Sequence, residues 1–254
     1  MAVTHGSFGR VRGGSHFIAP DNDITWGSGT FQIDGVGIVS VNEGSVEWTI
    51  DEPGGVVAFT TDTGDDDNVA LFLGTFQPST GGCFMEARFK FNSDSLGAVF
   101  AGFTETLALG TPVMPAEFAT ATMTYNGSGG MAGVSFDTDA TTADFRALAG
   151  DAGASAGSTV AGDTVTNGIR ANQTIAADEW YLVRVELGAG GHPRIYVGHD
   201  NRGMELIAEY TATAPVTNTD QFYAVLMFEN RSSAARVFEV DYFMAEGSVD
   251  WEVT

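Results

Sequence analysis

The chain has 254 residues, and its 33 Asp and Glu against 11 Lys and Arg give a formal charge of −22 at pH 7. This charge excludes the usual route to DNA or RNA, because proteins bind a phosphate backbone by releasing its counterions to Lys and Arg. The hydrophobic fraction of 43% excludes intrinsic disorder, since such a chain can bury enough apolar surface to offset its ordering entropy.

The basic residues are almost all of one type, because ten are Arg and Lys90 is the only lysine. An acidic, lysine-poor composition is expected of a protein in salty water, where screening over about 8 Å or less reduces self-repulsion. A GC-rich genome would explain the Arg bias equally well. The single Cys83 cannot form an intrachain disulfide, and the sequence shows neither a signal peptide nor an apolar run of about 20 residues. We therefore expect synthesis in a cytoplasm and no membrane span.

Residues 1–20 differ in charge from the remainder of the chain. They contain Arg10 and Arg12 but no acidic residue, so this segment is +2 while the other 234 residues carry −24. Its glycines favour an extended arm that needs another surface to order it, and a frayed terminus is the alternative. We predict an N-terminal arm and lead-in over residues 1–45 and one β-sandwich domain over residues 46–254.

The apolar stretches that follow have the period of two that is typical of strands, and Gly, Pro, Asn or Asp ends each of them. No window shows the spacing of an amphipathic helix. The seven prolines lie between these stretches, as hydrogen bonding within a sheet requires. The main predicted strands are residues 46–50, 56–61, 69–74, 83–91, 98–104, 131–137, 180–187, 194–197, 205–210, 221–229 and 236–245.

Two of these strands indicate how the sheets are covered. In residues 83–91 every odd-numbered residue is apolar, whereas Glu86, Arg88 and Lys90 fall on the other face with Phe84, so one face is buried. Residues 98–104 are apolar on both faces, as expected of a central strand covered by loops or by another layer. The pattern predicts an all-β protein with two antiparallel sheets packed face to face.

The C-terminal half carries an ordered set of strand motifs. They are WYLVRVE at residues 180–186, IYVG at 195–198, FYAVLMFE at 222–229 and VFEVDYF at 237–243. This order resembles the concanavalin A-like jelly-roll sandwich of laminin G and glucanase domains. Upstream, residues 84–91, 98–107 and 136–141 resemble tailed-bacteriophage structural proteins that use this sandwich. The resemblance covers residues 46–246, and it implies a jelly-roll fold and a place in a virion.

Glucanases of this fold hydrolyse sugars with two carboxylates about 5–5.5 Å apart, one as nucleophile and one as general acid. The nearest match to their motif is Glu239-Val240-Asp241 followed by Glu246, with four residues between Asp241 and Glu246 where the family has two or three. In a regular strand these two side chains point to opposite faces, and a bulge would restore the geometry only in part. We therefore predict no catalytic residue and no enzymatic activity.

The acidic loop over residues 62–68 offers hard oxygen ligands of the kind that calcium takes, as do residues 21–23 and 137–139 to a smaller degree. The loop is not an EF-hand, because it has no Gly at the sixth position and no Glu at the twelfth. A solvated turn is the alternative. The spacing leaves calcium open, and we assign neither metal ligands nor a cofactor.

The remaining reactive or aromatic residues form no catalytic motif. No nucleophile motif accompanies the four histidines, which are His5, His16, His192 and His199. Cys83 is expected to be a small buried hydrophobe. Trp48 and Trp180 are predicted to lie in the core, whereas Trp26 and Trp251 could pack against a neighbouring subunit.

The sequence thus favours a non-enzymatic virion protein, a capsid decoration protein that binds the outside of a phage head. Arg10 and Arg12 are the predicted partner-binding residues of the arm, and the −24 body faces solvent. By analogy, the expected partners are the major capsid protein and further copies of the chain, with a trimer suiting three-fold positions. Neither nucleic acid nor membrane is expected. A lectin-like carbohydrate-binding module is the alternative, and a glycosidase is the third hypothesis.

Overall fold

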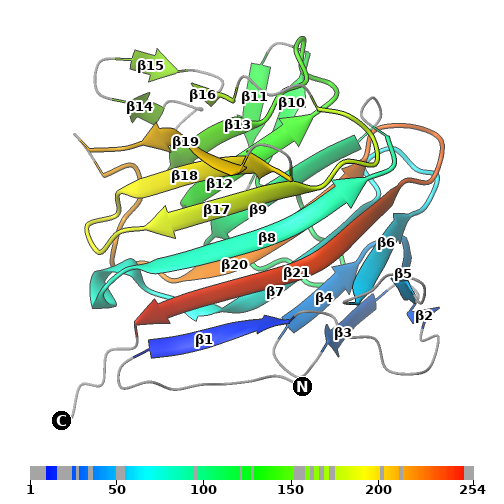
Figure 1. Cartoon of the computed structure of the whole chain (residues 1–254), viewed down its shortest axis with the longest axis horizontal. Helices are drawn as coiled ribbons and strands as arrows, with labels where there is room; N and C mark the ends of the chain where they lie inside the picture. Colours follow the sequence, from blue (N-terminus) through cyan, green and yellow to red (C-terminus); the bar gives the residue numbers. More distant parts are fainter. Residues whose placement is uncertain are drawn as a thin grey trace.

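The computed structural model is all-β over the residues that it describes, apart from one 3-10 turn, η1 (Pro78–Thr80), and two antiparallel sheets pack face to face (Figure 1). This confirms the predicted fold class. None of these residues lies in a helix long and apolar enough to cross a membrane. The described residues are 10–15, 25–26, 29–33, 37–49, 55–93, 97–120, 122–126, 129–151, 158–160, 163–165, 169–171, 175–200, 203–211 and 214–248.

One sheet, called sheet A here, has the strand order β19-β18-β17-β8-β21-β6-β5-β2, and β1 pairs with β21 beside this path. The long strand β21 pairs with β6 through its first residues and with β1 through its last residues. The strands of sheet A are β1 (Arg10–Ser15), β2 (Thr25–Trp26), β5 (Gly44–Thr49), β6 (Val56–Thr61), β8 (Cys83–Phe91), β17 (Tyr181–Leu187), β18 (Pro193–His199), β19 (Gly203–Glu209) and β21 (Val237–Ser248).

The other sheet, sheet B, has the order β16-β13-β12-β9-β20-β7-β4-β3. Its strands are β3 (Gly29–Ile33), β4 (Gly37–Val41), β7 (Asn68–Phe76), β9 (Gly97–Thr104), β12 (Met131–Asp137), β13 (Arg146–Gly150), β16 (Ile169–Arg170) and β20 (Phe222–Asn230). Two small hairpins complete the fold, β10 (Ala116–Ala119) with β11 (Thr122–Tyr125) and β14 (Ser158–Val160) with β15 (Asp163–Val165).

The main core lies between the two sheets and is rich in aromatic rings. In β8 buried and half-buried residues alternate along the whole strand, as its sequence predicts. Phe91 stacks between Phe136 of sheet B and Tyr181 of sheet A, with ring centroids 5.3 and 5.7 Å away. These rings join the inner faces of both sheets, so the two layers form a single sandwich.

A second apolar cluster covers the outer face of sheet B. On β9, Ala98 and Phe100 belong to this cluster, whereas Val99 and Phe103 face the main core, so the prediction that this strand is covered on both faces is confirmed. Phe118 from the β10–β11 hairpin packs in the outer cluster. The chain therefore fills this face of sheet B with its own side chains.

The N-terminal part departs from the predicted boundary at residue 45. Strand β4 pairs with β7 in sheet B, β3 pairs with β4, and β2 pairs with β5 in sheet A. Residues 10–15 are extended, but they pair with β21 as an edge strand of sheet A. Strand β2 has two residues, and β3 and β4 have five each and begin with glycine, so the alternation that marked the later strands is too brief to detect here. Strands before residue 46 therefore belong to the sandwich.

Candidate functional site

The outer face of sheet A carries the carboxylates that come nearest to the catalytic motif of glucanases. The pairing of β21 with β8 shifts register between Val240 and Tyr242, so Asp241 is an extra residue in a β-bulge. Burial then changes from even-numbered to odd-numbered residues along β21. Glu239, Asp241 and Glu246 consequently all lie on the outer face. The strand is therefore not regular, and a bulge of the kind considered from the sequence brings Asp241 and Glu246 to the same face.

Two of these carboxylates are held in ion pairs. Lys90 Nζ lies 2.5 Å from Glu239 Oε2, and Arg88 Nη1 donates to Asp241 Oδ2 at 2.6 Å. Arg88 also pairs with Asp200 Oδ2 at 2.7 Å. A carboxylate that serves as nucleophile must reach the sugar, whereas these two pair with neighbouring cations of the same face.

The cations of this face also cover Trp180. The guanidinium of Arg88 and the ammonium of Lys90 lie 4.3 and 4.9 Å from the centroid of its ring, as cation–π contacts. Trp180 is half-buried on the outer face of sheet A, so the prediction that it lies in the core is wrong. It precedes β17, and its neighbour Tyr181 takes the buried position instead.

A second row of polar contacts crosses four strands of sheet A. Glu86 accepts hydrogen bonds from Tyr242 Oη at 2.6 Å and from Arg184 Nη1 at 3.2 Å. Arg184 Nε donates to Glu186, which also accepts from Tyr196 Oη. Burial and the hydrogen bond to Glu86 raise the pKa of Tyr242. The outer face is thus pre-ordered by its own ion pairs.

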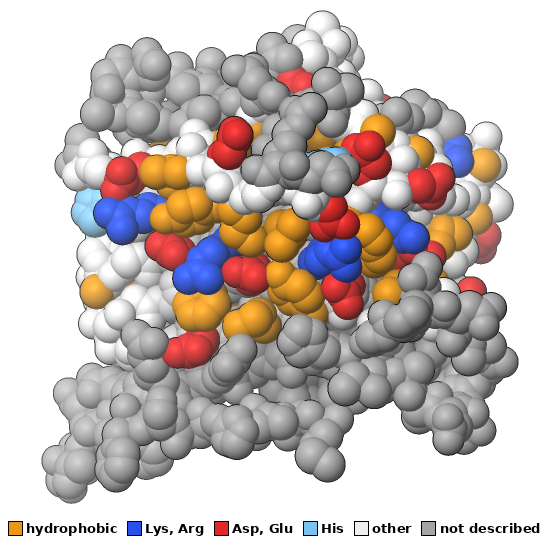
Figure 2. Space-filling model, viewed as in Figure 1, with side chains coloured by type: hydrophobic (Ala, Val, Ile, Leu, Met, Phe, Trp, Pro, Cys, Tyr) orange, Lys and Arg blue, Asp and Glu red, His pale blue; other side chains and the backbone are white. Residues whose placement is uncertain are grey.

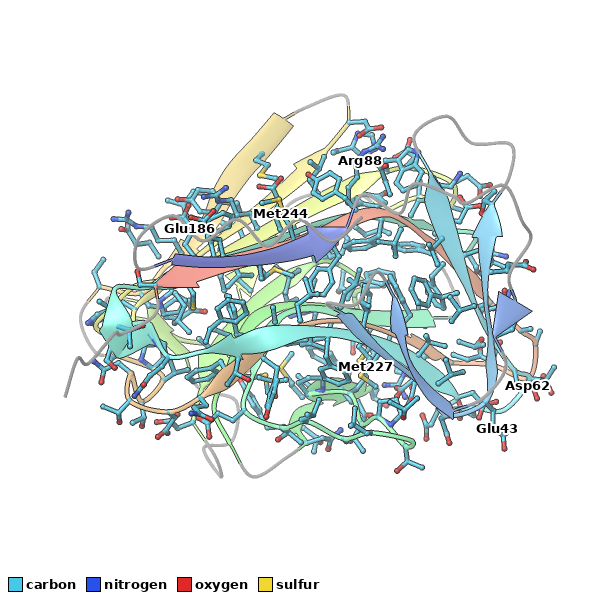
Figure 3. The ribbon with its side chains drawn as sticks, turned by 90° about the horizontal axis from the view of Figure 1, so that it is seen from below. Glu43, Asp62, Arg88, Glu186, Met227 and Met244 are labelled. Carbon is cyan, nitrogen blue, oxygen red and sulfur yellow. The ribbon has the colours of Figure 1, made fainter. Side chains whose placement is uncertain are left out.

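Figures 2 and 3 show the outer face of sheet A. In Figure 2 basic and acidic side chains alternate with hydrophobic ones over β8, β17 and β21. In Figure 3 Arg88, Glu186 and Met244 lie on the outer side of sheet A, while Met227 belongs to the outer cluster of sheet B. Sheet A therefore offers a mixed polar and aromatic surface, and sheet B a face filled by the chain itself.

A shallow pocket of about 310 Å³ lies at one end of sheet A, where β8 begins and β17 and β21 end. Phe84 forms an aromatic wall, and the guanidinium of Arg184 lies 4.3 Å from the centroid of its ring. Glu186 and Glu246 add carboxylates. The complete lining is Gly81, Gly82, Cys83, Phe84, Arg184, Glu186, Leu187, Gly188, Glu246 and Gly247.

On the outer face of sheet B, the structure brings together two of the three acidic segments that the sequence singles out. Asp66 of the loop 62–68 and Asp137 both pair with Arg231, at 2.5 and 3.0 Å. Glu229 of β20 pairs with the same guanidinium at 2.8 Å. The sequence reading missed Arg231, because it lies 165 residues from Asp66 and no local motif links them.

Burial perturbs one acid of this cluster, Glu229. It raises the pKa of Glu229 to about 8, although the charge of Arg231 acts in the opposite direction. Grouped carboxylates with perturbed pKa values often mark an active site. Here the side chains of Glu229, Asp137 and Arg231 are only 2%, 0% and 5% exposed, so they hold the fold together rather than face a ligand.

Two of the four aspartates in the acidic loop 62–68 are used within the loop. Asp62 Oδ1 accepts from the backbone N–H of Thr63, and Asp67 Oδ2 accepts from that of Gly64. Within the described part of the chain, no group of three or more His, Cys, Asp or Glu is arranged to hold a metal ion. Residues 21–23 lie outside the described residues.

Of the histidines that the structure describes, His192 directly precedes β18 and His199 is its last residue. His192 Nδ1 lies 3.0 Å from the carbonyl oxygen of Tyr210, and His199 Nε2 lies 2.5 Å from Glu179 Oε2. Both partners are hydrogen-bond acceptors, and neither is a hydroxyl or thiol that a histidine could activate as a nucleophile. His5, His16 and Trp251 lie outside the described residues, and the same holds for the side chains of Arg10, Arg12, Trp26 and Trp48.

Cys83 lies inside the sandwich at 7% exposure, which confirms the prediction that it is buried, and burial raises the pKa of its thiol to about 12. Relative to an ordinary thiol this means about 1000-fold less thiolate. We expect a thiol reagent at pH 8 to label the native protein far more slowly than the urea-unfolded chain, which is the matched control because it holds the same single thiol. Equal labelling rates would contradict the position of β8.

No family model matches the chain, and no curated protein matches it in sequence. Solved structures do resemble it. Rv0315, a pseudo beta-1,3-glucanase of Mycobacterium tuberculosis, has a TM-score of 0.55 at 13% identity, over 93% of this chain and 98% of that one. Peanut lectin has a TM-score of 0.53 at 12% identity, over 90% and 99%. The protein of unknown function SO2946 from Shewanella oneidensis has a TM-score of 0.54 at 10% identity, over 98% and 91%.

At these identities the likeness shows the fold alone. That fold is the concanavalin A-like jelly roll, which lectin and glucanase domains share, so the predicted architecture is confirmed. Because the same sandwich serves both kinds of protein, the choice of function depends on the surface chemistry of this chain.

Proposed function

We propose that this protein is a non-enzymatic binding module that acts as a capsid decoration protein on the surface of a virion. We infer the absence of enzymatic activity from the carboxylates, which form ion pairs with basic residues of the same chain. Glu239 and Asp241 pair with Lys90 and Arg88 on sheet A, and the acids on sheet B surround a buried Arg231. The outer face of sheet B is also filled by residues of the second apolar cluster.

The outer face of sheet A supports a docking role. Its ion pairs hold long side chains in place before any partner arrives, which lowers the entropic cost of forming an interface. Aromatic residues and Arg, which are enriched in protein interfaces, alternate on it. The edge strand β1 contains Arg10 and Arg12, opposite Ser248 and Glu246 of β21. We assign the protein to a virion because residues 46–246 resemble bacteriophage structural proteins.

The arm hypothesis is tested best by substitution. Deletion of residues 1–20 would remove β1 and bare the edge of β21, so the double variant Arg10→Gln and Arg12→Gln is the cleaner change. We expect it to keep the fold and to lose most of its attachment to capsids that lack this protein, as measured by co-sedimentation. The double variant Arg194→Gln and Glu209→Gln, which neutralises an ion pair far from β1, is the control. Full occupancy of the first variant, or absence of the chain from purified particles by mass spectrometry, would contradict the proposal.

Glycan binding is the second candidate, and the pocket at the end of sheet A favours it. An aromatic ring beside Arg and Glu side chains can contact the apolar face of a sugar and hydrogen-bond its hydroxyls. A glycan array tests this directly. Reproducible binding that is lost in Phe84→Ala but retained in Leu182→Ala, on the same face outside the pocket lining, would favour a lectin over a decoration protein.

A further inference from the structure

Three separate segments of the chain converge on Arg231. Asp66 comes from the loop before β7, Asp137 and Asp139 come from the end of β12 and the following turn, and Glu229 comes from the end of β20. The guanidinium is almost completely buried, with 5% of the side chain exposed. A single positive group thus lies at the centre of four acidic side chains.

Every nitrogen of this guanidinium faces a carboxylate. Nη1 lies 2.5 Å from Asp66 Oδ1 and 2.8 Å from Glu229 Oε1. Nη2 lies 3.0 Å from Asp137 Oδ2, and Nε lies 3.3 Å from Asp137 Oδ1 and 3.9 Å from Asp139 Oδ2. A calcium site in a protein has a similar arrangement, because carboxylate oxygens from separate parts of the chain surround one positive ion.

The cluster determines where its loops lie. Asn230, next to Arg231, donates its side-chain amide to the carbonyl oxygens of Asp62 and Gly64, and the backbone N–H of Asp66 donates to Asn230 O. Asp137 also accepts the backbone N–H of Phe118, which fixes the β10–β11 hairpin over sheet B. If the central charge were removed, the carboxylates of Asp66, Asp137 and Asp139 would repel one another, and the loops would lose their common anchor.

We infer that Arg231 is an internal cation that does, for this acidic end of the sandwich, the work of a bound divalent metal ion. The acidic loop 62–68 has the oxygen ligands of a calcium-binding loop, yet the described residues contain no group arranged to hold a metal ion. The positive charge beside this loop comes instead from Arg231. This role of Arg231 has two consequences. The native protein needs no calcium to fold, and removal of the guanidinium leaves a carboxylate-lined cavity with an affinity for calcium.

The test is thermal unfolding of the full chain in excess chelator, in millimolar calcium, and in sodium chloride of matched ionic strength. For the native protein the midpoint is expected to be the same in chelator and in calcium. For Arg231→Ala in chelator it is expected to fall by about 10 °C, because a buried charge pair loses one partner. Calcium, but not sodium chloride, is expected to restore a large part of that loss.

The control variant is Arg88→Ala, which also removes one Arg from two carboxylates but does so on the solvent-facing side of sheet A. It is expected to show no specific response to calcium. A native midpoint that falls in chelator, or a folded Arg231→Ala that binds no calcium by titration calorimetry, would overturn the inference. If Arg231→Ala does not fold in chelator, refolding on addition of calcium is the expected result, and failure to refold counts against it.

Discussion

Replacement of Phe89 by Ala is expected to lower the free energy of unfolding by about 3–5 kcal/mol. Phe89 is fully buried in β8, and its ring meets Phe145 and Phe228 edge-on, at centroid distances of 6.3 and 5.7 Å. The change leaves a cavity between the sheets and removes two favourable aromatic contacts. Equilibrium unfolding in urea measures the effect. The dependence of the unfolding free energy on urea concentration is expected to be the same for the variant and the native protein, so the shift in midpoint gives the change in stability.

Phe84 provides the matched control, because it lies on the same strand and points to the opposite face. It is half-buried, and its ring contacts the guanidinium of Arg184 rather than the core. Phe84→Ala is therefore expected to cost only about 1 kcal/mol. If the two variants were equally destabilised, the assignment of faces along β8 would be incorrect.

Stability is expected to fall as the pH rises from about 5 to 8, and Glu229→Gln is expected to reduce this dependence. Burial raises the pKa of Glu229 from 4.5 to about 8 in the folded protein. Between these values the folded state holds a proton that the unfolded state has released, so each pH unit weakens folding by up to about 1.4 kcal/mol. Gln resembles the protonated acid and removes this contribution.

Urea unfolding at several pH values between 5 and 8 tests this prediction, with the difference in slope between the variant and the native protein as the readout. Glu239→Gln on the half-exposed face of sheet A is the control, and it is expected to keep the native slope. Identical slopes for the native protein and Glu229→Gln would contradict the buried position of Glu229.

Features that depend on residues close together in the chain could be predicted from the sequence. The alternation in residues 83–91 predicted one buried face, the apolar run at 98–104 predicted a strand covered twice, and both are confirmed. Cys83 was placed correctly for the same reason. Side chains of a strand alternate between two faces, so a short window of sequence contains this information.

Features that depend on residues far apart in the chain could not be predicted and are visible in the folded structure alone. The bulge at Asp241 inverts the alternation of β21, because it arises from pairing with β8 about 150 residues away. Trp180 lies outside the core, where Arg88 and Lys90 of another strand cover it, and Tyr181 takes the buried position. Arg231 neutralises the acidic segments across 94 and 165 residues, and no local pattern of charge shows which cation will reach them. The acidic composition is evident in the sequence, whereas the carboxylates that pair with a basic residue are determined by the fold.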